Sequence, residues 1–227
     1  MTEENWQEVL RTRKPVTPFP LARRLSLCLT PALAKLPVSP NQITATSLVV
    51  GIAAAAAMMQ AAAAWSIAGA IMLVVYYVLD NCDGEIAVLK NQCTAFGHYF
   101  DSVVDWVVHA AFFAALGIGV QRATGNELWL WLGLIAAAGA TVNYFLCLCL
   151  ELYRPGTDQA GAAPPRPDGM KKWLVYTFRE LFRGDFCFIV LVLAVFDAAW
   201  LLLPAGAVGA QVYWLTRLVG RAGEFRA

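Results

Sequence analysis

Residues 80–105, DNCDGEIAVLKNQCTAFGHYFDSVVD, contain the four aspartates that decide how this chain must fold. Asp80 and Asp83 are three residues apart, and Asp101 and Asp105 are four apart, so each pair shares one face of a helix. A short polar turn separates the two apolar segments, and the inner aspartates each lie about nine residues from it, or roughly 14 Å of helix. A helical hairpin would therefore bring four carboxylates together at a similar height.

Four carboxylates in an apolar environment repel one another and need cations nearby to remain ionised. The two predicted helices offer no Lys or Arg at the level of the aspartates, so a divalent metal is the natural partner. An all-oxygen ligand set favours Mg²⁺ or Mn²⁺ over zinc. Gly84 and Ala87 leave one side of this site nearly bare, which suits a substrate better than a packed core.

The composition predicts an all-α integral membrane protein. Of the 227 residues, 59% are hydrophobic and only 15% are charged, against roughly a quarter in soluble domains. A spanning helix needs roughly 20 mostly apolar residues. Six segments qualify in whole or nearly so: 42–60, 65–89, 95–120, 127–152, 185–203 and 205–221. Six crossings place both termini on the same side of the membrane.

The residues before the first span predict an amphipathic helix on the membrane surface. Leu21, Leu25, Leu29 and Leu33 recur at helical spacing beside basic residues, although an ordinary solvated arm is the alternative. We expect three regions: a cytoplasmic arm at 1–40, a six-helix domain at 41–221 and a cytoplasmic tail at 222–227.

The basic residues predict the orientation, because Lys and Arg accumulate in cytoplasmic loops. With the N-terminus inside, sixteen of the seventeen Lys and Arg residues are cytoplasmic, and only Arg122 lies outside. We therefore expect a multi-pass protein of a bacterial-type inner membrane, with both termini and the aspartates at the cytoplasmic side. The net charge of +1 does not indicate a nucleic-acid partner.

Several other polar residues are candidates for supporting roles. His109 could hydrogen-bond Asp105, although a histidine satisfied by packing is the favoured alternative, and His98 could face a substrate. Asp197 is expected near the outer end and is interpreted as a structural or interface residue. Three residues at the entrance to the fifth span could grip a charged acceptor or a lipid phosphate: Arg179, Arg183 and Asp185.

The spacing of the aspartates resembles the signature of the CDP-alcohol phosphotransferases, D-x-x-D-G-x-x-A-R-x8-G-x3-D-x3-D. Seven of its positions are matched with every spacing kept: Asp80, Asp83, Gly84, Ala87, Gly97, Asp101 and Asp105. Seven specified positions within 26 residues make chance agreement very unlikely. The six-helix layout and the amphipathic helix also resemble the family.

This resemblance implies transfer of a phosphoalcohol group from a CDP-linked donor to an acceptor hydroxyl, with release of CMP. It also implies two divalent ions and a homodimer. Asp80, Asp83 and Asp101 would ligate metal, while Asp105 would touch the second metal and act as the general base. Hydrogen-bonding and small residues would line the nucleotide site: Asn41, Thr44, Gly84, Ala87, Thr94 and Gly97. Asn41 has a helix cap as its alternative role.

One position departs from the signature, because Val88 replaces its arginine. This replacement removes a cation placed to engage the donor phosphate, and Lys90 lies on another face of the helix. The departure puts the identity of the donor in doubt and raises the alternative of a catalytically weakened relative that acts as a membrane partner. A divalent-cation transporter is a further alternative, but its acids would lie near mid-membrane on broken helices.

The substrates are predicted only by class. The donor is expected to be CDP-diacylglycerol or another CDP-alcohol, and the product a phospholipid or polar lipid. The local sequence, NCDGEIAVLK followed by FGHYFDSVVDW, most resembles members that use inositol phosphate or related polar alcohols, and a lipid alcohol stays open as the acceptor.

Overall fold

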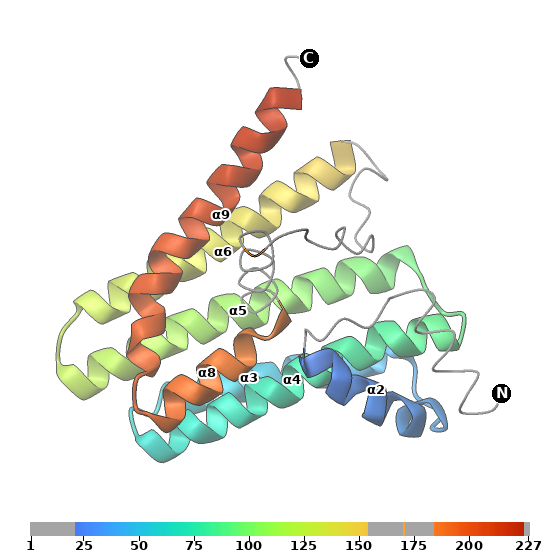
Figure 1. Cartoon of the computed structure of the whole chain (residues 1–227), viewed down its shortest axis with the longest axis horizontal. Coiled ribbons are helices and arrows are strands. Elements are labelled where there is room, and N and C mark those ends of the chain that lie inside the picture. Colours follow the sequence, from blue (N-terminus) through green and yellow to red (C-terminus); the bar gives the residue numbers. More distant parts are fainter. Residues whose placement is uncertain (1–20, 154–169, 171–183, 225–227) are drawn as a thin grey trace.

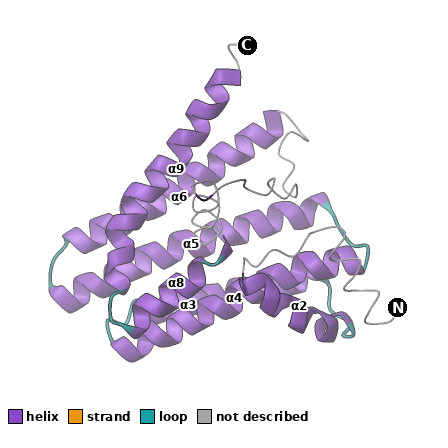
Figure 2. Ribbon diagram, viewed as in Figure 1, coloured by secondary structure: helices purple, strands orange, loops and turns teal. Residues whose placement is uncertain are grey.

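The computed structural model describes residues 21–153, 170 and 184–224, and every regular element in these residues is a helix (Figure 2). The elements are α2 (Leu21–Ala34), α3 (Pro40–Met58), α4 (Ala63–Leu89), α5 (Ala95–Thr124), α6 (Leu128–Tyr153), α8 (Phe186–Val195), η1 (Ala199–Leu201) and α9 (Leu202–Glu224). Four of them, α3 to α6, are long and apolar enough to cross a membrane.

The helices from α3 to α6 run up and down beside one another (Figure 1). Helix α3 packs closely against both α4 and α5, and α6 packs against α5 and α9. In the described chain, helices α4 and α5 do not pack closely against each other. Helix α3 holds both of them in place, and the side chains of α4 and α5 that face each other meet across the space between the two helices. Helices α6 and α9 move away from α5 toward their C-terminal ends (Figure 1).

The helix ends follow from local capping chemistry. Ser39 begins α3 with a capping box, in which its hydroxyl accepts from the Gln42 N–H and the Gln42 side chain accepts from the Ser39 N–H, with Pro40 at the first turn. Thr94 caps α5 by accepting from the Gly97 N–H. Gly125 ends α5 with a left-handed φ of 72°, which costs glycine little.

The predicted fifth span, 185–203, is wrong as a single helix. Helix α8 ends at Val195, and Asp197 adopts a left-handed φ of 54° that interrupts the helical path before η1 and α9 begin. The apolar composition continues through this break, so hydropathy alone joined two elements. The break reverses the chain, which lets α9 return along α6.

Helices α5 and α6 approach closely at a pair of facing glycines. A Cβ added to Gly117 would lie 3.1 Å from the Cα of Gly133, and a Cβ added to Gly133 would lie 2.6 Å from the Phe113 carbonyl oxygen. Side chains at these positions would separate the two helices. Small residues allow membrane helices to approach in this way.

A buried polar contact fastens α2 to α4. Glu85 is only 3% exposed, and its carboxylate accepts from the Ser26 hydroxyl at 2.8 Å and the Thr30 hydroxyl at 2.6 Å. Arg23 lies 3.9 Å from the same carboxylate. Burial lowers the pKa of the Arg23 guanidinium, and the negative charge of Glu85 opposes that shift. The position of α2 on the bundle is therefore fixed by these polar contacts as well as by the apolar packing of Ala22 and Leu33.

Replacing Glu85 should loosen this contact strongly. Glu85→Ala removes the buried carboxylate that the Ser26 and Thr30 hydroxyls donate to and that the Arg23 guanidinium lies beside, and we expect a loss of about 3 kcal/mol in the free energy of unfolding. Glu151→Ala is the matched control, because Glu151 pairs with His98 at a site where both side chains are partly exposed. That change should cost less than about 1 kcal/mol. Unfolding by denaturing detergent measures both, and equal losses would contradict the role of Glu85.

Candidate active site

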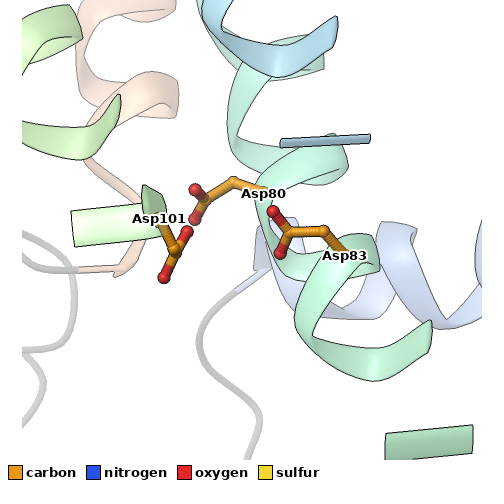
Figure 3. A group of neighbouring side chains, drawn as sticks. All are labelled: Asp80, Asp83 and Asp101. Atoms are coloured by element: carbon orange, nitrogen blue, oxygen red, sulfur yellow. The ribbon is translucent and has the colours of Figure 1, made fainter. Parts of the chain in front are cut away.

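Three carboxylates from α4 and α5 converge at one point. One oxygen from each of Asp80, Asp83 and Asp101 lies within 4.8 Å of the others. Figure 3 shows Asp80 and Asp83 projecting from one helix toward Asp101 on the facing helix. The predicted convergence of these three aspartates thus matches the geometry, and the separation of α4 from α5 leaves room for their side chains.

This geometry fits a divalent cation. Asp83 is 4% exposed, and Asp80 Oδ1 is buried without receiving a hydrogen bond within the described residues. Buried carboxylate oxygens that face one another need a positive partner, and oxygen ligands alone suit Mg²⁺ or Mn²⁺. Asp80, Asp83 and Asp101 are therefore the residues that would hold the ion.

A hydroxyl on α3 orients one of these ligands. Thr44 is 3% exposed, and its hydroxyl donates to Asp83 Oδ2 at 2.5 Å. Contacts of this kind fix a ligating carboxylate in one rotamer. The sequence predicted Thr44 as a nucleotide contact, and the structure adds a direct link to the metal-site carboxylate.

Three of the predicted nucleotide-site residues come together beside the carboxylates. A Cβ on Gly97 would lie 3.2 Å from both Asn41 Oδ1 and Thr94 Oγ1, so this glycine leaves room for the two polar side chains. The alternative role of Asn41 as a helix cap is wrong, because Ser39 caps α3. Asn41 is thereby left without a capping role.

The other side of the predicted site is open near the end of α4. Among the described residues, a Cβ added to Gly84 meets nothing within 4 Å, and Ala87 adds only a methyl group about one turn later. Lys90 does not replace the missing arginine, because its ammonium donates to the carbonyl oxygens of Leu36 at 2.9 Å and Val38 at 2.7 Å. Lys90 thus fastens the segment between α2 and α3 to the end of α4.

The fourth aspartate, Asp105, lies one helical turn after Asp101 on α5 and has a partner that was not predicted from the sequence. The Tyr76 hydroxyl donates to Asp105 Oδ1 at 2.5 Å. His109, the partner considered from sequence, contacts the Asp105 backbone oxygen through Nδ1 at 2.7 Å and the Tyr77 hydroxyl through Nε2 at 2.8 Å. Tyr76 precedes Asp80 by four residues, and Asp105 follows Asp101 by four. In an antiparallel helical hairpin these spacings place Tyr76 and Asp105 at the same level, so the sequence contained the information needed to predict their contact.

The remaining candidates have other partners or lie outside the described residues. His98 pairs with Glu151 at 3.2 Å, and Asp185 accepts from the Ala22 N–H at 3.0 Å, at the start of α2. Asp197 lies in the break after α8, as a structural role requires. The predicted roles of Arg179 and Arg183 fall outside the described chain.

Comparison with known proteins agrees with this geometry. Residues 37–165, which include all four aspartates, match the family model for CDP-alcohol phosphatidyltransferase. The chain belongs to this family. The predicted resemblance is therefore confirmed, and the match extends from the start of α3 through α6.

Two similar proteins carry the name bifunctional IPC transferase and DIPP synthase. The one from Aquifex aeolicus is 29% identical over 136 residues, which cover 59% of this chain and 31% of that protein. The one from Thermococcus kodakarensis is 32% identical over 123 residues, or 54% of this chain and 26% of that protein. The matched part of this chain thus spans less than a third of either relative.

Removing the Thr44 hydroxyl should weaken metal binding. Thr44→Val keeps the shape of the side chain but leaves Asp83 Oδ2 without its donor, and we expect Mn²⁺ affinity to fall about tenfold. Thr46→Val is the matched control, because Thr46 is exposed and its hydroxyl donates to the Gln42 carbonyl oxygen on the same helix. Titration of the detergent-solubilised protein with Mn²⁺, followed by electron paramagnetic resonance, measures both. Unchanged affinity in Thr44→Val would contradict an orienting role.

Proposed function

We propose that this protein transfers a phosphoalcohol group from a CDP-alcohol donor to an acceptor hydroxyl and releases CMP. One observation carries the proposal: in a member of this family, Asp80, Asp83 and Asp101 bring their oxygens within 4.8 Å of one another from two different helices. Such a set suits two divalent ions, Mg²⁺ or Mn²⁺, which when bound would neutralise the donor pyrophosphate and the charge on departing CMP.

Asp105 is proposed as the catalytic base and as a contact to the second ion. The acceptor oxygen attacks the phosphorus that carries the donor's alcohol, a new P–O bond forms, and the P–O bond to CMP breaks. CMP leaves with the electron pair, and the acceptor proton passes to the Asp105 carboxylate. A positioned base contributes about 10²- to 10⁴-fold to such a step.

The nucleotide is proposed to bind between the first turns of α3 and α5 and the open end of α4. Asn41, Thr44, Thr94 and Gly97 come from the first two elements, and Gly84 and Ala87 from the third. The polar groups suit the ribose and cytosine, while the open volume beside Gly84 suits a flat or bulky group. Val88 stands where the signature has an arginine, so this surface lacks one cation that would bind the donor phosphate. This replacement supports the alternative of a weakened relative acting as a membrane partner.

The proposed donor is CDP-diacylglycerol or another CDP-alcohol, and the proposed acceptor is inositol phosphate, a related polar alcohol or a lipid alcohol. The resemblance of NCDGEIAVLK and FGHYFDSVVDW to members that use polar alcohols supports this range. The shared name of the two relatives is compatible with it.

The proposed setting is a bacterial-type inner membrane, with six crossings, cytoplasmic termini, a cytoplasmic active site and a homodimer. The four long apolar helices support the first four crossings of the proposed domain 41–221. On α2, Leu21, Leu25 and Leu29 are 38%, 46% and 37% exposed, on a face adjacent to the one that contacts Glu85. This apolar face supports a surface helix within the proposed arm 1–40, and 222–227 is the proposed tail.

The test is CMP release by purified protein with Mg²⁺ or Mn²⁺, across CDP-alcohol donors crossed with polar and lipid acceptors. Asp105→Asn should lower kcat about 10²- to 10⁴-fold while the site of Asp80, Asp83 and Asp101 still binds one ion, because the change removes the proton acceptor and keeps the shape of the side chain.

Asp197→Asn is the matched control and should leave the rate unchanged, because Asn tolerates the left-handed backbone at this position. Silence from folded, metal-bound wild-type protein across the whole panel would favour the membrane partner. Uptake of a divalent cation into vesicles that contain the protein, without CMP release, would favour a transporter.

A further inference from the structure

We propose that Tyr76 is a positioning residue that holds the Asp105 carboxylate in the orientation that accepts the proton of the acceptor hydroxyl. This inference rests on the proposed function, because it assigns a role through the proposed base. The observation that carries it lies outside the cluster of Asp80, Asp83 and Asp101: the Tyr76 hydroxyl donates to Asp105 Oδ1 at 2.5 Å, and Tyr76 is the one described residue hydrogen-bonded to this carboxylate.

The tyrosine ring is held rigidly, so its hydroxyl has a fixed position. Tyr76 is 0% exposed and meets the Tyr77 ring edge-on, with 5.4 Å between their centroids. A Cβ on Gly51 of α3 would lie 3.2 Å from Tyr76 Cδ2 and 2.5 Å from a Val108 methyl group, so this glycine makes the space in which the ring packs. A phenol packed on several sides cannot follow a moving carboxylate and therefore fixes it.

The length of tyrosine matches the separation of the two helices. Helices α4 and α5 each pack on α3 and do not pack closely on one another, so a bond from α4 to Asp105 must cross the space between them. The aromatic ring provides that reach without a flexible chain. Tyr76 lies one turn before Asp80 and Asp105 lies one turn after Asp101, so this contact forms a layer roughly 5.4 Å from the carboxylate cluster.

The contact leaves the carboxylate able to act as a base. A carboxylate has about four lone-pair sites on its two oxygens, and the tyrosine occupies one of them. The remaining sites can receive the acceptor proton while the hydrogen bond prevents rotation of the group. Orientation of this kind matters for rate, because misplacing a reacting group by about 1 Å can cost about 10²-fold.

The next residue provides a matched control. Tyr77 is also buried on α4, at 7% exposure, and its hydroxyl makes a similar hydrogen bond to His109 Nε2 at 2.8 Å. That bond does not involve the Asp105 carboxylate. Removing either hydroxyl therefore deletes one buried hydrogen bond between α4 and α5, but only one of the changes releases the proposed base.

The experiment compares Tyr76→Phe and Tyr77→Phe in full-length protein, using the donor and acceptor pair with the highest CMP release. Tyr76→Phe should lower kcat about 10- to 100-fold, with both KM values within about threefold of wild type. Mn²⁺ affinity and the thermal midpoint in detergent should match those of Tyr77→Phe, whose kcat should stay within about twofold of wild type.

Two results would overturn the role of Tyr76 while leaving the proposed function intact. One is a Tyr76→Phe protein whose kcat stays within about threefold of an active wild type. The other is a parallel fall of kcat, Mn²⁺ affinity and thermal midpoint, which a packing defect produces. A wild-type protein that binds Mn²⁺ but releases no CMP from any pair would remove the proposed function, and the role of Tyr76 with it.

Discussion

The structure depends on one constraint, which is that carboxylate oxygens from α4 and α5 face one another between two helices that are apolar enough to cross a membrane. Like charges in a medium of low dielectric constant repel strongly, so two helices that carry them do not associate through that face. The fold resolves this conflict by packing both helices on α3 instead. Helix α3 therefore sets the distance across which the aspartates meet, and with it the room left for cations and substrate.

The surrounding helices brace this arrangement with polar contacts. Thr44 of α3 holds Asp83, Tyr76 holds Asp105, and Ser26 and Thr30 of α2 hold Glu85. At the end of α4, Lys90 binds two carbonyl oxygens of the segment that joins α2 to α3. The end of α4 is thus held by α2, by α3 and by the segment that joins them, which gives the proposed site a rigid frame.

The spacing of the aspartates was sufficient to predict that Asp80, Asp83 and Asp101 converge, because positions three and four apart share a helix face. Partners from other helices were not predictable in the same way. Thr44 is 39 residues from Asp83, and its contact depends on how α3 crosses α4. The break at Asp197 was missed because hydropathy measures composition and not backbone conformation.

Gly84 shows where the demands of folding and of function separate. A glycine inside a helix is less favourable than alanine by about 1 kcal/mol, and here a methyl group would touch nothing in the described chain. The polypeptide therefore has no steric reason of its own to keep glycine at this position. The helix gives up intrinsic stability at a position in the proposed nucleotide site, so selection for stability alone would replace this residue, whereas selection for the proposed activity would retain it.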